Sequence, residues 1–390
     1  MPASPSTARA INDRLALRLL QQDGPLTATQ LKTLTGLSRP TVADLVERLR
    51  GAGLIHVVGE TGADRRGPNA RLYGIVADRA LLAGLDVRTD SVAVVVADLL
   101  GATLAEATLP VGEAEEDAVE QAVALLTSTV RSAGSAPLHS VGIGAPGLID
   151  PVTGELRDST GLPSWHRSLV RALQERLPAT VLVENETNLA AVAEHRVGAA
   201  RDHDTFVLLW LGHGVGAAVM LDGKVRRGAS GGAGELGFLP VPGTAGTPSA
   251  VNCEGGFHSL AASVPLCELA AGYGIAVAGE GQEPGAAAAV RAALAGEGDS
   301  EGFLGALADR IALGAAAVAS VLDPGLVLLS GEVGHAGGQV LAARVEERLE
   351  AMSPLRTGVR AGLLGGTAVR RGALLAARDA AQDALFATGA

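Results

Sequence analysis

Short apolar stretches alternate with helical stretches along most of the chain, and this alternation restricts the possible folds more than any other feature. Strands are expected in LLAGLDV from Leu81, in VGIGAP, in TVLVEN and in GLVLLS from Gly325. Helices are expected between them, one from Glu113 to about Ser132 and another from Thr187 to Gly198. Strands that alternate with helices are typical of α/β proteins. We therefore predict an α/β fold with a duplicated core of sheet and helices.

The length of 390 residues exceeds what one hydrophobic core usually supports, so more than one domain is expected. Residues 1–78 lack the alternating pattern, and we predict that they form a separate domain from residues 79–390. The longest apolar stretches, such as Ile311 to Leu322, are shorter than the roughly 18 to 20 residues that cross a bilayer. No charged leader with an apolar core opens the chain, and two cysteines are too few for a disulfide framework. We expect a cytoplasmic protein with no membrane partner.

Charge is distributed unevenly within a total of −11. Residues 1–80 contain 11 basic and 7 acidic residues, whereas the remainder contains 20 basic and 35 acidic residues. The acidic total argues against a protein that coats nucleic acid with its whole surface. The asymmetry predicts a small anion-binding module attached to an acidic body.

Three helical patterns occupy the basic N-terminal part. The first covers residues 7–22, ends at Gly24-Pro25 and places four apolar side chains on one face: Ile11, Leu15, Leu19 and Leu20. The second is capped by Thr27, ends at Gly36 and is expected to point Leu31 and Leu34 inward. The third begins with Ser38 as N-cap, and its apolar stripe consists of Val42, Leu45, Val46 and Leu49.

The short turn at Gly36-Leu37 joins two helices in the manner of a helix-turn-helix, whose second helix reads base edges in the major groove. Two β patterns, LIHVVGE and RLYGIV, then enclose a basic tip, TGADRRGPNA, that could lie along phosphates as a wing. Three-helix units with basic loops also occur in modules that bind no DNA, and Arg48 could be a solvated helix-face residue. The predicted DNA-contacting residues are Thr27, Ser38, Arg39, Pro40, Thr41, Asp44, Arg48, Arg65, Arg66 and Gly67.

Specific segments carry a resemblance to known families. GLSRPTVADLVERLRGAGLI, together with the arginine hairpin, resembles the winged helix-turn-helix domains of bacterial regulators. Four later segments resemble the ROK family, named for repressors, open reading frames and kinases: Val141 to Gly154, Val183 to Ala200, Gly212 to Phe238, and Leu322 to Gly334. The resemblance implies an actin-like, hexokinase-like two-lobed ATPase fold with a sugar cleft. It further implies one lobe at about 79–198 plus a C-terminal helix at 367–390, and a second lobe at about 199–366.

Residues that serve nucleotide chemistry in ROK kinases are altered in this chain. Phosphate loops need glycines so that backbone N–H groups can approach the phosphates. The family's Asp-x-Gly-Gly-Thr loop is replaced by Asp86-Val87-Arg88-Thr89-Asp90, and a Gly-Gly pair is replaced by Gly331-Glu332. The loop Gly212 to Gly216 keeps its glycines but has His213 in place of threonine, and the catalytic Asn-Asp pair is Asn185-Glu186. We predict that the protein is not an enzyme and uses no nucleotide cofactor.

The positions that bind sugar in the family are better preserved in this chain than the positions that serve nucleotide chemistry. The resemblance implies that Asn185, Glu186 and Glu235 bind sugar hydroxyls, with His258 as a further candidate that could instead be a surface or capping histidine. Trp165 falls in a loop implied to close over the sugar, although a single Trp could equally pack in a core. Phe238 and Val251 replace two of the family's four zinc ligands, which leaves Cys253 and His258, and two ligands do not make a structural zinc site.

The resemblance therefore implies a transcriptional regulator, a repressor of carbohydrate uptake or metabolism genes, controlled by a sugar or sugar derivative. Its expected partners are a double-stranded DNA operator, the sugar effector and further copies of itself in a homodimer or tetramer, because palindromic operators match two-fold symmetry. Whether it represses or activates stays open. Two alternatives are an ATP-dependent sugar kinase with an attached DNA-binding domain, and an interaction module with a vestigial cleft.

Overall fold

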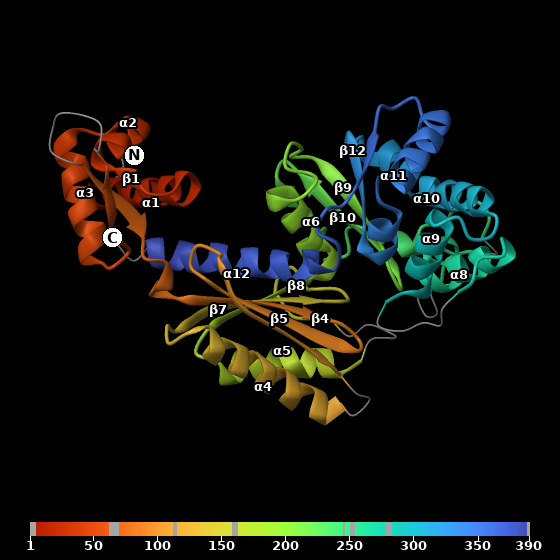
Figure 1. Cartoon of the computed structure of the whole chain (residues 1–390), viewed down its shortest axis with the longest axis horizontal. Coiled ribbons are helices and arrows are strands. Elements are labelled where there is room, and N and C mark those ends of the chain that lie inside the picture. Colours follow the sequence, from red (N-terminus) through yellow and green to blue (C-terminus); the bar gives the residue numbers. More distant parts are fainter. Residues whose placement is uncertain are drawn as a thin grey trace.

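The computed structural model describes residues 5–61, 70–111, 115–157, 163–244, 246–249, 254–277 and 283–387. The chain forms three regions in a row, which are a small N-terminal domain and two lobes, each built on a five-stranded sheet (Figure 1). The predicted α/β fold with a duplicated core is confirmed.

The N-terminal domain is a winged helix-turn-helix. Its helices are α1 (Pro5–Asp23), α2 (Ala28–Thr35) and α3 (Arg39–Gly51). A three-stranded sheet with the order β1-β3-β2 joins β1 (Leu26–Thr27), β2 (Ile55–Thr61) and β3 (Ala70–Ile75). The antiparallel pair β2 and β3 is the hairpin predicted for the wing. The apolar stripe predicted for α3 is buried as expected, because it faces the core of this domain.

Two predictions about inward-facing residues in this domain are wrong. Ile11 and Leu15 are 58% and 39% exposed, and Leu34 is 49% exposed. The buried face of α1 instead contains Asp13, Ala16, Leu17 and Leu20. The register of α1 is set by Asp13, whose carboxylate accepts hydrogen bonds from Arg48 of α3 at 2.6 and 3.3 Å. A buried ion pair therefore replaces part of the apolar face that simple periodicity predicts.

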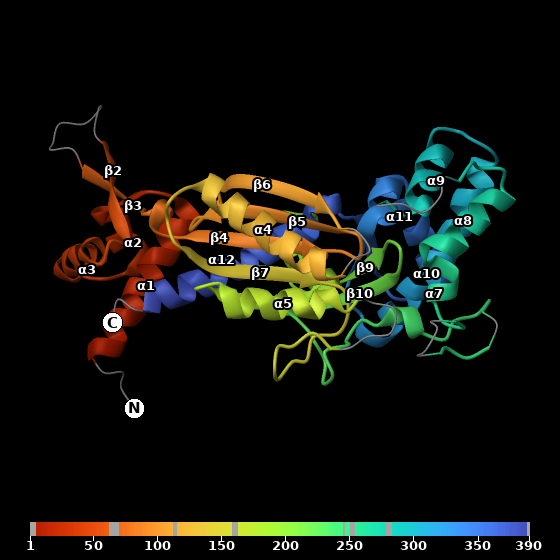
Figure 2. The same cartoon turned by 90° about the horizontal axis from the view of Figure 1, so that it is seen from below.

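Lobe one contains a sheet with the order β6-β5-β4-β7-β8. Its strands are β4 (Leu81–Val87), β5 (Ser91–Asp98), β6 (Thr103–Pro110), β7 (Leu138–Ala145) and β8 (Thr180–Asn185), with a short helix η1 (Ala77–Arg79) before them. Helices α4 (Glu115–Ala133) and α5 (Trp165–Arg176) cover one face, and α12 (Ala368–Ala387) covers the other (Figures 1 and 2). Trp165 is buried among the side chains between sheet and α5, so it packs in this core.

Lobe two repeats this plan with the sheet order β11-β10-β9-β12-β13. Its strands are β9 (Phe206–Leu211), β10 (Val215–Leu221), β11 (Lys224–Val225), β12 (Leu326–Ser330) and β13 (Gly358–Ala361). In the order given for each sheet, the first three strands pair antiparallel to one another. The last two strands are each parallel to the strand before them. Helix α6 (Glu186–Val197) leads from lobe one into lobe two.

Helices α7 (His258–Ala261), α8 (Ser263–Gly272), α9 (Gly285–Leu294), α10 (Ser300–Leu322) and α11 (Gly331–Met352) complete lobe two, with short helices η2 (Leu236–Phe238) and η3 (Gly365–Thr367). By length and composition α10 could cross a membrane, which the sequence analysis did not anticipate. Phe303, Leu307 and Ile311 of α10 are fully buried in the core of lobe two. This burial explains the apolar composition of α10 without a membrane.

The backbone of helix α12 lies directly against the backbone of the lobe-one sheet. A Cβ atom at Gly142 of β7 would collide with the carbonyl group of Ala373, and one at Gly84 of β4 would lie 2.6 Å from the carbonyl oxygen of Arg370. Only glycine allows this approach, because any side chain would push the helix away from the sheet. The C-terminal half of α12 then continues to the winged domain.

Replacing Gly142 by alanine is expected to lower the free energy of unfolding by about 3 kcal/mol, because the new methyl group overpacks the contact with α12. Urea denaturation followed by circular dichroism measures the change. Gly272→Ala is the control, since no atom lies within 4 Å of the added methyl group at the end of α8. Equal stabilities of the two variants would contradict this description of the helix contact.

Candidate functional site

The exposed first turn of α3 forms the centre of the predicted DNA-binding surface. The Ser38 hydroxyl accepts a hydrogen bond from the backbone N–H of Thr41 at 3.3 Å, and the two hydroxyl oxygens are 2.7 Å apart. Ser38 therefore caps the helix as predicted. Arg39, Pro40 and Asp44 are exposed beside this cap. The cap fixes the start of α3 and leaves these side chains accessible.

Two of the predicted DNA-contacting residues have structural partners inside the domain. Thr27 is buried and forms a capping box with Gln30 at the start of α2. Arg48 lies between buried Asp13 of α1 and exposed Asp44 of α3, and it forms ion pairs with both. The hydrogen bond to Asp13 is the largest cause of a raised Arg48 pKa. Thr27 thus caps α2 and Arg48 joins α3 to α1, and contact of either residue with DNA stays a prediction.

Strands β2 and β3 pair as the hairpin predicted for the wing. Arg65, Arg66 and Gly67, predicted at its tip, lie outside the described residues.

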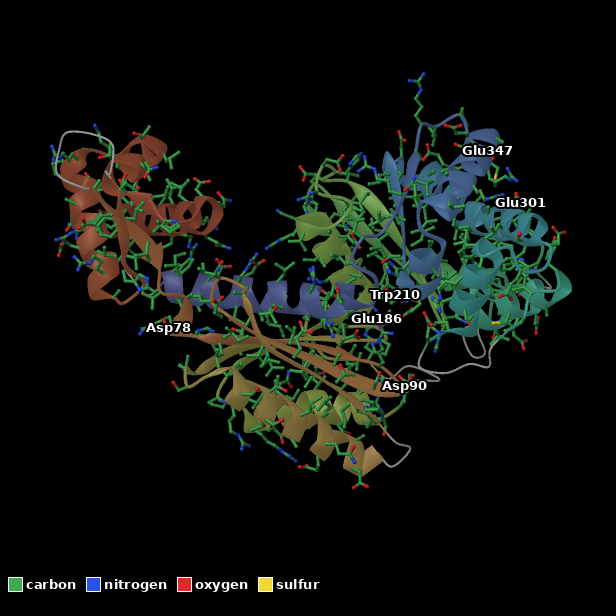
Figure 3. All side chains as sticks on the ribbon, in the orientation of Figure 1. Asp78, Asp90, Glu186, Trp210, Glu301 and Glu347 are labelled. Atoms are coloured by element: carbon green, nitrogen blue, oxygen red, sulfur yellow. The ribbon has the colours of Figure 1, made fainter. Side chains whose placement is uncertain are left out.

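A cavity of about 250 Å³ lies between the two lobes. Lobe one contributes the loop after β4 and the start of α6, and lobe two contributes the ends of β9 and β12. Figure 3 labels Asp90, Glu186 and Trp210 in the region where the two lobes meet. The lining residues are Arg88, Thr89, Asp90, Pro146, Glu186, Trp210, His213, Gly214, Pro284 and Glu332. The predicted cleft is present, and all four regions named as altered phosphate-binding or catalytic elements line it.

Arg88 connects the two lobes across this cavity. Its Nη1 atom donates to Oε1 of Glu332 at the start of α11 in lobe two, at 2.6 Å. Its Nε atom is 3.3 Å from Oδ2 of Asp86 at the end of β4 in lobe one. The sequence analysis treated Arg88 and Glu332 as two separate losses of glycine. The structure joins them as one ion pair, and their opposite charges were the signal that could have indicated it.

Three carboxyl groups surround the single Arg88 guanidinium, and this excess changes their protonation. Burial, followed by the nearby Asp86 carboxyl, raises the pKa of Glu186 to about 8. Burial also raises the pKa of Asp86, against the attraction of Arg88. The surrounding carboxylates raise the pKa of Arg88 more than its burial lowers it. The cavity therefore offers a fixed cation and a carboxyl group that is partly protonated near neutral pH.

Of the four predicted sugar-binding residues, only Glu186 lines the cavity. Glu186 lines the cavity, whereas Asn185 caps α6, where its Oδ1 accepts from the N–H groups of Thr187 and Asn188. The Asn185 amide also donates to the carbonyl oxygen of Gly147 at 3.0 Å. These contacts give Asn185 a positioning function for the helix that begins with Glu186.

Glu235 and His258 lie in lobe two, behind the loop that borders the cavity. His258 begins α7, and a Cβ atom added to Gly214 would lie 3.3 Å from its ring. Glu235 immediately precedes η2 and remains accessible to solvent. Burial by the surrounding protein raises the pKa of Glu235 and lowers that of His258. Neither residue lines the cavity itself.

A second contact between the lobes was missed by the sequence analysis. Arg227 of lobe two donates to Oε2 of Glu184 in β8 of lobe one, at 2.6 and 2.5 Å. Oε1 of Glu184 accepts a hydrogen bond from the Asn188 side chain at 2.9 Å. Two ion pairs therefore join the lobes, Arg88 with Glu332 and Arg227 with Glu184.

Within the described parts of the chain, His, Cys, Asp and Glu side chains form no cluster of three or more that could hold a metal ion. Phe238, at a position of the family's zinc ligands, lies in η2. Val251 and Cys253 lie outside the described residues.

Together these features define a two-lobed protein of hexokinase-like fold with an N-terminal winged helix-turn-helix. The ROK family model matches residues 82–379, and a winged helix-turn-helix DNA-binding model matches residues 9–56. The chain belongs to the ROK family.

Two curated relatives are similar to part of this chain in sequence. The chain is 26% identical over 238 residues to the xylose repressor of Caldicellulosiruptor bescii, covering 60% of this chain and 59% of the relative. It is 27% identical over 240 residues to the DNA-binding transcriptional dual regulator NagC of Escherichia coli, covering 60% and 58%. The similarity thus spans about three fifths of these relatives.

Among solved structures, a ROK family transcriptional regulator described as a homologue of the Escherichia coli MLC protein superposes with a TM-score of 0.78. It covers 98% of both chains at 20% identity, which shows the shared fold. A ROK family glucokinase from Streptomyces griseus, in complex with glucose and AMPPNP, gives a TM-score of 0.65 at 25% identity. That match covers 77% of this chain and 100% of the glucokinase.

Glu186 is expected to make stability depend on pH. Because its folded-state pKa is about 8 and lies above the ordinary value of 4.5, the fold favours its protonated form, and stability falls as pH rises from about 5 to 8. We expect a decrease on the order of 2 kcal/mol in the wild type and a smaller decrease in Glu186→Gln, measured by urea denaturation at both ends of this range. Glu350→Gln, at an exposed site, is the control. An unchanged pH dependence in Glu186→Gln would contradict the assignment.

Proposed function

We propose that the protein is a sequence-specific DNA-binding transcriptional regulator controlled by a sugar or sugar derivative in the cleft. The observation that carries this proposal is an apolar cluster shared by the winged domain and the body. Leu374, Ala377, Ala381 and Phe386 of α12 pack in one cluster with the core of α1, α2 and α3. Nearer the N-terminus of α12, Ala368, Val369 and Ala373 pack with strands of lobe two. One helix thus contacts the winged domain and both lobes.

This helix supplies a physical route for control. A ligand that closes the cleft shifts one lobe against the other, and α12 transmits the shift to the winged domain. The ligand changes DNA affinity only to the extent that it binds the two arrangements differently. The name of one relative, xylose repressor, supports repression of carbohydrate genes as the output.

The proposed DNA-binding domain consists of residues 1–78, and the proposed sensor domain consists of residues 79–390. Within the sensor, lobe one is formed by residues 79–198 together with 367–390, and lobe two is formed by residues 199–366. We propose that α3 enters the major groove, with Ser38, Arg39, Pro40, Thr41 and Asp44 nearest the bases. The wing would contact phosphates through Arg65, Arg66 and Gly67. A homodimer or tetramer would present two such domains to a two-fold symmetric operator in the cytoplasm.

We further propose that the cleft binds an effector and does not phosphorylate it. The Arg88 and Glu332 ion pair spans the cavity, and the carboxylates of Asp90 and Glu332 repel a nucleotide polyphosphate. Glu186 and Glu235 provide carboxyl groups that suit polyol hydroxyls, with His258 behind them and Asn185 positioning Glu186.

The double variant Arg65→Ala with Arg66→Ala is expected to weaken DNA binding and to lower the slope of log affinity against log salt by about 2, one unit for each lost phosphate contact. A DNA site is first selected from a random-sequence pool, and affinities are then measured by gel shift at several salt concentrations. Arg356→Ala, at an exposed site in lobe two, is the control. Unchanged affinity and slope in the double variant would exclude the wing as a DNA contact.

A thermal-shift screen of sugars and sugar phosphates is expected to identify an effector that also alters DNA affinity. Glu186→Gln and Glu235→Gln should each weaken effector binding by about tenfold, because each removes a carboxyl group that hydrogen-bonds a sugar hydroxyl. Glu350→Gln should bind like the wild type. An effector whose affinity is unchanged by both Glu186→Gln and Glu235→Gln would place its site elsewhere.

The same sugar panel tests the competing kinase function through a coupled assay of ADP release. We expect no turnover above background. Robust turnover that Glu186→Ala abolishes would identify a kinase and overturn the proposed role of the cleft.

A further inference from the structure

Two cavities outside the cleft meet at Arg378 of α12. One, of about 320 Å³, lies between α12 and the β5 and β6 side of lobe one. The other, of about 510 Å³, lies where α12 and α6 face α1 of the winged domain. Figure 1 shows α1 beside the C-terminal part of α12. Arg378 lines both cavities, so it stands at the junction between the DNA-binding domain and the body.

These cavities are basic, although the chain as a whole has a net charge of −11. Three carboxylates line them, from Glu106, Asp379 and Asp383, and six arginines do so. The arginines are Arg14, Arg18, Arg196, Arg370, Arg371 and Arg378.

Two of the carboxylates are already engaged by arginines. Arg196 binds Asp379 through two hydrogen bonds of 2.8 and 2.6 Å, and Arg370 lies 3.4 Å from Glu106. Within the described residues, no ion pair is formed by the other four arginines, which are Arg14, Arg18, Arg371 and Arg378. A surplus of positive charge therefore remains at the junction.

The Arg378 guanidinium is the least satisfied of these groups. Its Nε atom is buried and has no hydrogen-bond partner among the described residues. Burial lowers the pKa of Arg378, and the neighbouring Arg196 lowers it further against the attraction of Asp379. A buried donor without an acceptor costs free energy, and a charged one costs more. A bound anion would neutralise the surplus charge of these arginines.

We propose that the cavities around Arg378 form a binding site for a small phosphate-bearing anion, either free phosphate or a phosphate monoester. Guanidinium groups bind phosphate oxygens with paired hydrogen bonds, and arginines of both α1 and α12 line the second cavity. A phosphate held by Arg14, Arg18 and Arg378 would attach the winged domain to the body. The site is separate from the sugar cleft, and its occupation requires neither sugar nor DNA.

Thermal unfolding of the full chain tests the site. Inorganic phosphate and glycerol 3-phosphate are titrated separately, with chloride keeping the ionic strength constant. We expect a saturable rise in the unfolding midpoint for the wild type. Arg378→Gln and Arg18→Gln should lower the affinity about tenfold, because each removes a charge-assisted contact. Arg356→Gln, an exposed arginine in lobe two, should keep the wild-type affinity.

Tighter binding of glycerol 3-phosphate would indicate a phosphate monoester as ligand, and tighter binding of inorganic phosphate would indicate the free ion. The proposal is overturned if the wild type gives no saturable response, or if both Arg378→Gln and Arg18→Gln respond like the wild type. Because Arg18 is exposed, Arg18→Gln decides the question alone if Arg378→Gln does not fold.

Discussion

The close packing of α12 on the sheet of lobe one is the contact on which the rest of the structure depends. Gly84 and Gly142 let the helix backbone reach β4 and β7, and this depth brings its remaining faces against α6, lobe two and the winged domain. A helix held further out would leave the winged core open on the side now filled by Phe386. The same helix also carries Arg378 to the junction with α1.

In the cleft, two positions where related kinases have phosphate-binding glycines carry charged residues that form an ion pair. Phosphate loops depend on bare backbone N–H groups, and glycine keeps them accessible. At two such positions this chain carries Arg88 and Glu332, which bind each other across the lobes. The buried carboxyl groups beside them then shift in pKa, because one guanidinium cannot neutralise three neighbours. Under the proposed function, this charge distribution makes the cavity suit neutral hydroxyl-rich ligands better than polyphosphates.

Local sequence rules predicted much of the fold. The caps at Thr27 and Ser38, the stripe on α3 and the hairpin of the wing all follow from interactions within a few residues. The predicted inward face of α1 was wrong, since its register depends on Asp13 meeting Arg48, 35 residues away. In the candidate site the sequence located Glu186 in the cavity, but it did not indicate that Asn185 is engaged in capping or that Arg227 pairs with Glu184.

The sequence by itself determined the order and type of the elements, the two kinds of domain and the loss of glycine from the phosphate loops. These properties depend on backbone conformation and on short-range periodicity, which neighbouring residues specify. Only the tertiary structure decided which charges meet, because Arg88 and Glu332 are 244 positions apart and the cavities at Arg378 combine α1, α6 and α12. Burial and electrostatic interaction depend on distance in space, and the fold alone sets those distances.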